Sequence, residues 1–304
     1  MDITHPIFTD ADKAREHLER LNWPNGPVCP HCGERENVTR LAGKSHRPGL
    51  IQCNTCTKNF TVTVGTVFER SKIELNKWLL ATYLLSSSKK GMSAHQLHRM
   101  LGVTYKTAWF MCHRIREAMK GGGSDGPLGG RGSVVEADET YVGGKARNRA
   151  TRKPAAKKAV VALVERDGHV RSFHVANVTA KDLRGLIVTN VDRGSHLMTD
   201  ESHVYTRVGR EFNGHNVVNH SAKQYVTTGG FKHSNTAENF FSIFKRGVIG
   251  TYHHMSQAHL ARYTAEFDFR YNTRKITDAE RADIALTGIV GKRLTYRRTD
   301  RLAA

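Results

Sequence analysis

Four of the five cysteines stand in two closely spaced pairs. Two residues separate Cys29 from Cys32 and Cys53 from Cys56, and 20 residues lie between the pairs. Two thiolates on each of two neighbouring turns can complete a tetrahedral shell of four sulfur ligands, which structural Zn²⁺ prefers. The alternatives are a redox-active Cys-x-x-Cys motif or buried cysteines without a metal. Because four protein ligands leave no position open for a substrate, we expect this Zn²⁺ to be structural.

Carboxylates in the second half of the chain stand where strands are expected to end. Asp138 follows the alternating start of segment 133–141, Asp200 follows a short apolar run, and Glu238 lies in a segment with helical apolar spacing. Three such carboxylates can hold Mg²⁺ or Mn²⁺ for in-line phosphoryl displacement. Spacing alone leaves other interpretations open, because Asp favours strand ends and Asn235 with Glu238 has the spacing of a capping box. Neighbouring carboxylates that could enter the same set are Glu136, Glu139 and Glu201.

A helix-turn-helix pattern precedes these carboxylates. Apolar residues recur at helical spacing over 93–119, and Gly102 interrupts the pattern, as expected for two helices joined by a short turn. The second helix carries Lys106, Arg114 and Arg116, and we expect these side chains to contact DNA. The alternative is an ordinary pair of packed helices.

The charge of the chain favours a polyanionic partner. The 304 residues include 47 Lys and Arg against 28 Asp and Glu, a formal net charge of +19. Such an excess is typical of proteins that bind nucleic acid. The longest apolar run, residues 159–164, is too short to span a bilayer, and no charged-then-apolar leader opens the chain. An anionic membrane surface is the alternative, but no strongly amphipathic basic helix stands out. We therefore expect an intracellular, cytoplasmic protein that binds nucleic acid, double-stranded DNA in view of the helix-turn-helix pattern, and no membrane partner.

The elements that must position these residues can be read from the same patterns. Strands are predicted over 60–64, 133–141, 159–165, 170–178, 196–199 and 216–221. Helices are predicted over 10–21, 74–86, 93–119, 180–191, 236–248 and 256–271. The glycine-rich residues 121–132 read as a linker.

Longer motifs cover most of the chain, at residues 23–33, 138–145, 218–221, 233–247, 250–254 and 266–272. Together they resemble bacterial insertion-sequence transposases that join an N-terminal zinc ribbon to an ISXO-like DDE catalytic domain. The resemblance implies a mixed α/β fold, in which an RNase H-like domain with a central mixed sheet flanked by helices follows a zinc ribbon and a helix-turn-helix.

The resemblance also implies roles for individual residues. Asp138, Asp200 and Glu238 correspond to the three catalytic, metal-binding carboxylates, and Lys245 corresponds to a basic residue that contacts transposon-end DNA. Asn is the third catalytic residue in some members, and Asn235 and Asn239 flank Glu238. His220 and His233 are expected to support the site by hydrogen bonds rather than to bind metal.

We therefore expect a DNA transposase that binds terminal inverted repeats, hydrolyses phosphodiester bonds at the element ends and transfers the 3′-OH ends to target DNA by two-metal chemistry. Pairing of two ends implies a homo-oligomer, associated with the bacterial nucleoid when bound to DNA. The alternatives are a non-catalytic zinc-ribbon and helix-turn-helix regulator and an RNase H-type nuclease without strand transfer. The expected order is an N-terminal helix (1–24), zinc ribbon (25–68), helix-turn-helix (72–120), linker (121–132), catalytic domain (133–280) and basic tail (281–304).

Overall fold

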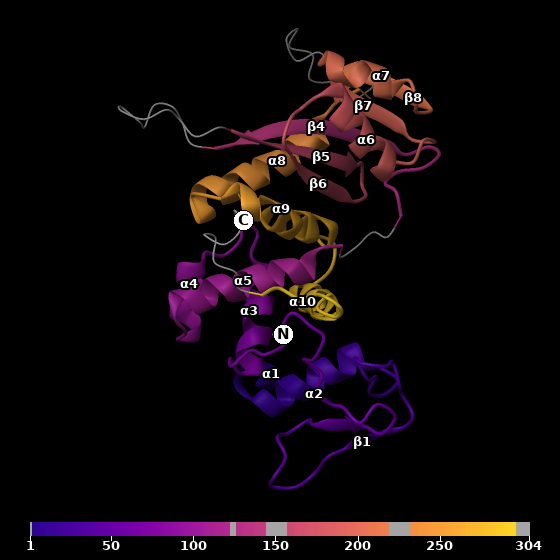
Figure 1. The fold of residues 1–304 in the computed structure, drawn as a ribbon. Helices are drawn as coiled ribbons and strands as arrows, with labels where there is room; N and C mark the ends of the chain where they lie inside the picture. The colour runs from indigo at the N-terminus through magenta and orange to yellow at the C-terminus, as the bar shows by residue number, and fades with distance from the viewer. Residues whose placement is uncertain (1, 122–125, 144–156, 219–231, 296–304) are drawn as a thin grey trace, which may run out of the picture. The chain divides into compact units, whose positions relative to one another are not determined.

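The computed structural model describes residues 2–121, 126–143, 157–218 and 232–295 (Figure 1). The chain divides into two units: residues 1–122 together with 276–304 form the first, and residues 123–275 form the second. The segment after residue 275 thus belongs with the N-terminal region, whereas the sequence predicted that the catalytic domain extends to residue 280. None of the helices in the described parts is long and apolar enough to cross a bilayer.

The zinc-ribbon region of the first unit is a small antiparallel sheet. Its strands, in the order β1-β2-β3, are β1 (Val38–Arg40), β2 (Ile51–Cys53) and β3 (Asn59–Phe60). Ile51, Phe60 and two of the cysteines form its core, against which Trp23 packs. The strand predicted over 60–64 is wrong beyond Phe60, because the chain turns over residues 62–65.

Helices make up the rest of the first unit. The two predicted helices and the short turn between them are present, and Gly102 joins the helices in the left-handed conformation at φ 62°, which glycine adopts without steric cost. Thr104 caps the second helix by accepting a hydrogen bond from the Thr107 amide. The helices are α1 (Pro6–Thr9), α2 (Ala11–Asn22), α3 (Leu75–Ser87), α4 (Ala94–Leu101), α5 (Tyr105–Met119) and α10 (Asp278–Thr287).

The segment predicted as a basic tail (281–304) begins inside a helix, so that prediction is wrong for its described part. Helix α10 packs against α2, α3 and α5. Ala282, Ala285 and Leu286 are buried, and His17 of α2 lies 2.8 Å from the Asp283 carboxylate. The apolar residues of this short helix, rather than the charges that follow it, decide its place.

The second unit is built on a five-stranded mixed sheet, in which the strands lie side by side in the order β6-β5-β4-β7-β8. Strands β4 to β6 pair antiparallel, whereas β4, β7 and β8 are parallel. This order and these directions are those of an RNase H-like sheet, so the predicted fold class is confirmed. The strands are β4 (Val134–Val142), β5 (Lys158–Glu165), β6 (Val170–Val175), β7 (His196–Asp200) and β8 (Gly214–Val218).

Helices cover both faces of the sheet (Figure 1). Phe240 and Phe244 of α8 pack with Val160 and Ala162 on one face. Val161 alternates to the opposite face and packs with α6. The helical elements are α6 (Ala180–Asn190), η2 (His203–Tyr205), α7 (Thr206–Gly209), α8 (Asn235–Gly247), the π-helical turn η3 (Val248–Tyr252) and α9 (Gln257–Asn272).

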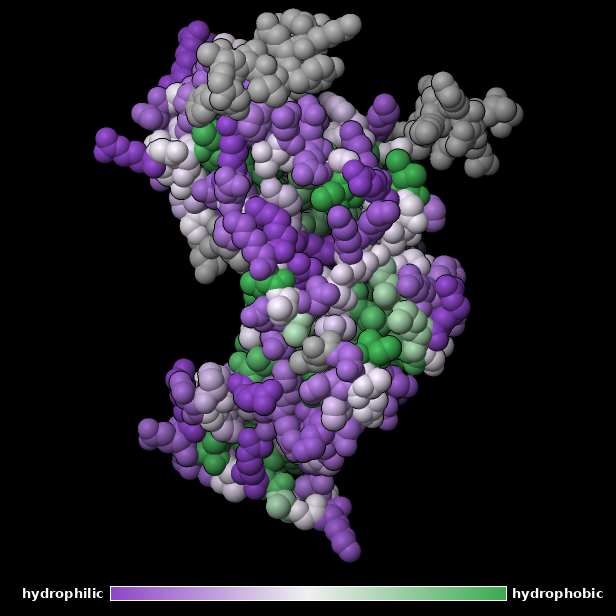
Figure 2. All heavy atoms as spheres, turned by 180° about the vertical axis from the view of Figure 1, so that it is seen from behind, coloured by the Kyte–Doolittle hydropathy of each residue, from purple (hydrophilic) through white to green (hydrophobic). Residues whose placement is uncertain are grey.

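The predicted linker ends earlier than the sequence suggested. Leu128 is 1 % exposed, and its backbone bonds to Asn190 and Asp192. Residues 128–132 therefore lie within the second unit. On the face of the molecule shown in Figure 2, hydrophilic side chains predominate and hydrophobic ones appear in small separate groups.

Candidate active site

The register of two parallel strands brings Asp138 and Asp200 together. The backbone pairs between β4 and β7 run from Val134–His196 to Glu136–Met198. Asp138 and Asp200 each stand two residues beyond that last pair, so side-chain alternation puts both on the same face of the sheet. This point lies at the carboxyl end of β7, between strands whose chain connections leave in opposite directions. Such switch points are where open α/β sheets bind ligands.

The carboxylates gathered here form a group suited to a cation. Asp138, Glu139 and Asp200 each offer an oxygen, and these oxygens lie within 4.8 Å of one another. Burial, together with the charges of Glu139, Asp200 and Glu238, raises the pKa of Asp138 to about 7, although the Glu139 amide donates to its Oδ1 at 2.7 Å. A divalent cation would remove this repulsion, and carboxylate oxygens are the ligands that Mg²⁺ and Mn²⁺ prefer. The donor set therefore fits the predicted metal.

Glu139 belongs to this group although its backbone position alternates to the opposite face. Its carboxylate accepts a short hydrogen bond from the Tyr205 hydroxyl. Burial raises the pKa of Glu139, and the charge of Asp200 adds to the effect, whereas the Tyr205 bond opposes it. Glu139 thus links the three-carboxylate group to Tyr205 of η2.

Glu238 approaches the site from α8. It lies outside the three-carboxylate group, and its side chain is exposed, but its charge acts on the pKa of Asp138. The capping-box interpretation does not hold, because Ser234 is the N-cap of α8 and makes no side-chain capping bond. Asn235 and Asn239, the alternatives for the third position, are both exposed on the first turns of the same helix.

The amides at the start of α8 bond instead to Glu136, whose role the sequence did not predict. Glu136 is 0 % exposed, and its Oε2 accepts from the Thr236 and Ala237 amides, each at 2.9 Å. His233 lies beside it, with Nδ1 3.2 Å from Oε1. Strand alternation could have placed Glu136 on the face of Asp138, but no local pattern reveals a partner 100 residues away. His220 lies outside the described residues.

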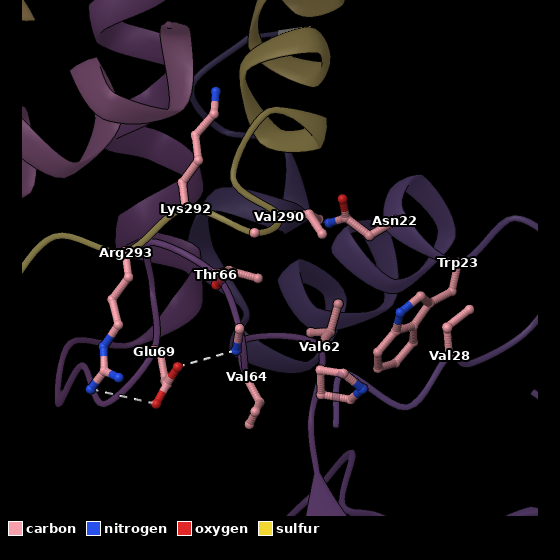
Figure 3. A pocket seen from close by; sticks show the side chains of 13 residues that line it. Asn22, Trp23, Val28, Val62, Val64, Thr66, Glu69, Val290, Lys292 and Arg293 are labelled. Carbon is pink, nitrogen blue, oxygen red and sulfur yellow. Dashed lines mark hydrogen bonds and ion pairs between the residues drawn. The ribbon is translucent and has the colours of Figure 1, made fainter. Parts of the chain in front are cut away.

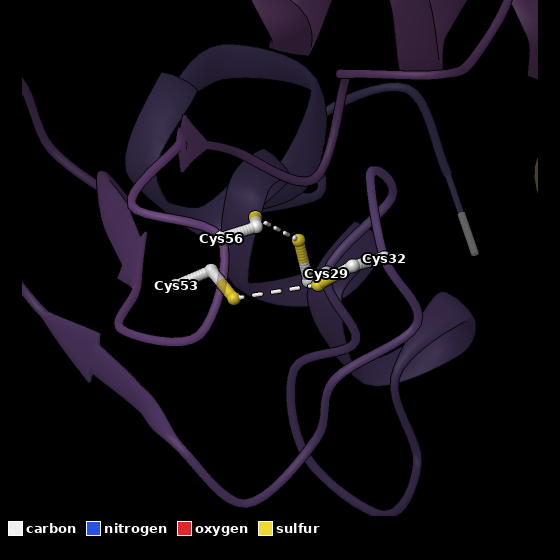
Figure 4. A group of neighbouring side chains, drawn as sticks. All are labelled: Cys29, Cys32, Cys53 and Cys56. Carbon is white, nitrogen blue, oxygen red and sulfur yellow. Dashed lines mark hydrogen bonds between the residues drawn. The ribbon is translucent and has the colours of Figure 1, made fainter.

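The four cysteines of the zinc ribbon come together as predicted (Figure 4). The Sγ atoms of Cys29 and Cys56 are 3.7 Å apart, and those of Cys32 and Cys53 are 3.6 Å apart. These separations are too long for disulfides. They match the roughly 3.8 Å between ligands of a tetrahedral Zn²⁺ with bonds of about 2.3 Å.

The ionisation of these thiols also fits a metal site. The Cys56 amide hydrogen-bonds to Cys53 and lowers the pKa of that thiol to about 7. At Cys32 the Glu34 amide lowers the pKa, but local desolvation and the other three cysteines outweigh it and raise the pKa to about 12, although the residue is exposed. The neighbouring sulfur atoms thus shift the pKa values of Cys32 and Cys53 in opposite directions, and a bound Zn²⁺ would favour the thiolate form of its ligands.

The predicted DNA-contacting residues of α5 differ in their surroundings. Lys106 is exposed on the first turn. Arg114 is half-buried, donates to the carbonyl oxygens of Glu69 (3.3 Å) and Leu294 (3.2 Å), and stacks over Phe110. The prediction is wrong for Arg116, which is 2 % exposed and therefore lies in the core of the unit.

Two pockets of the first unit lie near these elements. One of about 330 Å³ is lined by basic side chains, Arg70, Lys72, Lys106 and Arg114, and by the Trp78 ring. A second, of about 590 Å³, has Trp23 and Val62 on one side and the 290–293 segment on the other (Figure 3). In it, Glu69 accepts from the Gly65 amide at 3.2 Å and lies 3.8 Å from Arg293.

Comparisons with known proteins match both halves of the chain. Residues 9–59 match the transposase zinc-ribbon domain of the IS1595 family, and residues 127–272 match the ISXO2-like transposase domain. An uncharacterized protein in transposable element ISH50 of Halobacterium salinarum is 27 % identical over 282 residues, covering 86 % of this chain and 91 % of that protein.

Among solved structures, the comparison finds a chain of a simian T-cell lymphotropic virus intasome bound to the PP2A regulatory subunit B56 gamma. The identity is 14 % and the TM-score is 0.30, over 58 % of this chain and 63 % of that chain. The match therefore spans less than two thirds of that chain.

Proposed function

The chain is an insertion-sequence transposase with the zinc-ribbon and catalytic domains of the IS1595 group, and we propose that Asp138, Asp200 and Glu238 form its catalytic site. The observation that carries the proposal is the register of β4 and β7, which sets Asp138 side by side with Asp200. Asp200 ends β7 as expected, whereas β4 continues past Asp138 to Val142. A third carboxylate, on α8, is close enough to act on the pKa of Asp138.

These residues would hold Mg²⁺ or Mn²⁺ beside the scissile phosphodiester. Metal ions bound there would activate the attacking oxygen and stabilise the leaving oxygen of an in-line displacement. The carboxylates orient that displacement, first with water at the element end and then with the freed 3′-OH at target DNA. The same arrangement can serve both steps because each is an attack of an oxygen on a phosphodiester. Glu139, which accepts a hydrogen bond from Tyr205, would add a further carboxylate to the metal site.

DNA recognition is assigned to other surfaces. In the helix-turn-helix, Lys106 and the 44 %-exposed Tyr105 stand at the N-terminus of α5, the end of a recognition helix that contacts bases. The basic pocket beside Lys106 fits a backbone phosphate. Lys245 is exposed on α8, seven positions after Glu238, where it would contact the element end near the catalytic site. The zinc ribbon would complete recognition of the terminal inverted repeats, and pairing of two ends would require a homo-oligomer.

The direct test is strand transfer on DNA that carries the terminal repeats of the chain's own element. Wild-type protein with Mg²⁺ should yield joined products, and Asp200→Asn should yield none while still binding the ends. Asp268→Asn is a matched control, because Asp268 lies on α9 and its carboxylate accepts hydrogen bonds from Ser172. Cleavage by Asp200→Asn at the wild-type rate would refute the catalytic assignment. End binding without cleavage by either protein would instead indicate a DNA-binding regulator, and cleavage without joining would indicate a nuclease.

A further inference from the structure

A buried carboxylate joins the strand that carries Asp138 to the helix that carries Glu238. Glu136 precedes Asp138 by two residues on β4, so both side chains lie on the α8 face of the sheet. Glu136 is 0 % exposed, which places it outside any surface that DNA or solvent could reach. A buried carboxylate is costly unless it is fully bonded, so its partners define its role.

Those partners come from the start of α8 and from one arginine, and His233 Nδ1 also lies 3.2 Å from Oε1. Oε2 accepts from the Thr236 and Ala237 amides at 2.9 Å, and Oε1 accepts from the Thr236 hydroxyl at 3.0 Å. Arg166 donates from Nε to Oε1 and from a terminal nitrogen to the His233 carbonyl oxygen, both at 2.7 Å. We call the three side chains of Glu136, Arg166 and Thr236 the α8 anchor.

The anchor takes the place of an ordinary N-cap. The first amides of a helix have no partner within it, and the N-cap Ser234 makes no side-chain capping bond to them. A negative charge at this end is also favoured by the helix dipole. The capping group of α8 therefore belongs to the central strand of the sheet, and it fixes where the helix begins relative to β4.

We propose that Glu136 is a positioning residue that sets Glu238 against Asp138. The amides it holds belong to the two residues directly before Glu238, so a shift at the anchor moves the third carboxylate of the site. Arg166 and the helix end neutralise Glu136, which keeps its charge from competing for the metal. The effect of Glu136 on metal binding rests on the proposed catalytic site, whereas its bonds to the start of α8 do not.

The anchor is tested first in protein without added divalent metal, by residue-resolved hydrogen exchange. Glu136→Gln should make the Thr236 and Ala237 amides exchange at least about tenfold faster. Glu266→Gln is the matched control, since Glu266 is also 0 % exposed and pairs with an arginine, Arg270, but lies on α9. Equal exchange at both amides in wild type and Glu136→Gln would overturn the anchor.

The consequence is tested by Mn²⁺ binding in calorimetry and by the Mg²⁺ dependence of cleavage. Glu136→Gln should weaken Mn²⁺ binding and raise the half-saturating Mg²⁺ concentration by about 10- to 100-fold, with end-DNA affinity unchanged. Behaviour like that of Glu266→Gln would make Glu136 merely structural and overturn the proposal. If Glu136→Gln does not fold, Thr236→Val removes only one hydroxyl donor and should give a smaller shift in the same direction. If the wild-type protein binds no Mn²⁺, the proposed catalytic site is refuted. Hydrogen exchange still tests whether Glu136 holds the first amides of α8.

Discussion

Asp138 and Asp200 stand at matched positions on neighbouring parallel strands, each two residues past the last backbone pair between β4 and β7. Their proximity is therefore a property of sheet register, which a slip by one residue would destroy by turning one side chain to the other face. The position of the third carboxylate depends instead on helix packing, because Glu238 lies on α8, which packs against β4 and β5.

Two acidic residues, Glu238 and Glu139, are candidates for the third catalytic carboxylate. Glu238→Gln should lower strand cleavage by more than about 100-fold, because it removes a proposed metal ligand. Glu139→Gln should lower it by only about tenfold, because the Tyr205 hydroxyl already engages that carboxylate. Single-turnover cleavage at saturating Mg²⁺ measures both.

Tyr205→Phe is the matched control for Glu139, since it removes the hydroxyl bond and leaves the carboxylate. It should have an effect no larger than that of Glu139→Gln. A greater loss in Glu139→Gln than in Glu238→Gln would reverse the assignment and make Glu139 the third catalytic carboxylate.

The elevated pKa of Asp138 predicts a pH-dependent stability in protein without added divalent metal. Burial first, and then the neighbouring carboxylates, raise that pKa to about 7 from an ordinary value of 3.8. Between these values the folded state holds the proton more tightly than the unfolded state does. The free energy of unfolding should therefore fall as pH rises from about 4 to about 7 and level off above it. Asp138→Asn should abolish this part of the fall.

The two units offer an internal reference for that measurement. All three tryptophans, Trp23, Trp78 and Trp109, lie in the first unit, so their fluorescence follows its unfolding. Circular dichroism follows both units. The fall in the free energy of unfolding should appear in the transition of the second unit, which circular dichroism detects and tryptophan fluorescence does not. Adding Mg²⁺ at pH 8 should restore stability more in wild type than in Asp138→Asn. Parallel pH profiles for the two proteins would contradict the prediction.

The zinc ribbon should lose its structure with its metal. Cys53→Ser removes one of four sulfur ligands and should abolish the single tightly bound Zn²⁺, because a structural zinc site contributes folding free energy directly. Metal analysis and end-DNA binding give the readout, with binding expected to fall while Mn²⁺ affinity of the second unit stays the same. Cys112→Ala, at the buried cysteine of α5, should keep the Zn²⁺. Full zinc content in Cys53→Ser would exclude the four-sulfur site.

Much of this arrangement could be predicted from local sequence. Several features have signals that lie within a few residues of one another. The cysteine pairs are marked by their spacing, the helix break by Gly102, and the five strands of the RNase H-like sheet by alternation. Asp138 and Asp200 can be predicted for the same reason, since each directly follows three buried residues of its strand, although β4 continues beyond Asp138.

What could not be predicted depends on contacts between distant segments. Glu136 looked like one more acidic neighbour, because its partners at Thr236 and Ala237 lie 100 and 101 residues away. The return of α10 to the first unit had no local signal either, because its few apolar residues are followed by a basic segment. Arg116 is 2 % exposed because its face of α5 packs inside the unit, and its charge alone does not reveal that face.

Lys106 and Arg116 occupy the same helix and should separate DNA binding from folding. Lys106→Ala, at an exposed position, should leave the thermal unfolding of the first unit unchanged, weaken binding of end DNA and reduce the dependence of log K on log salt by about one. Arg116→Ala, at 2 % exposure, should instead destabilise that unit by about 2–3 kcal/mol. Tryptophan fluorescence and DNA titrations at several salt concentrations measure the two effects. Loss of end binding in Arg116→Ala at temperatures where the unit is still folded would return Arg116 to the DNA-contacting set.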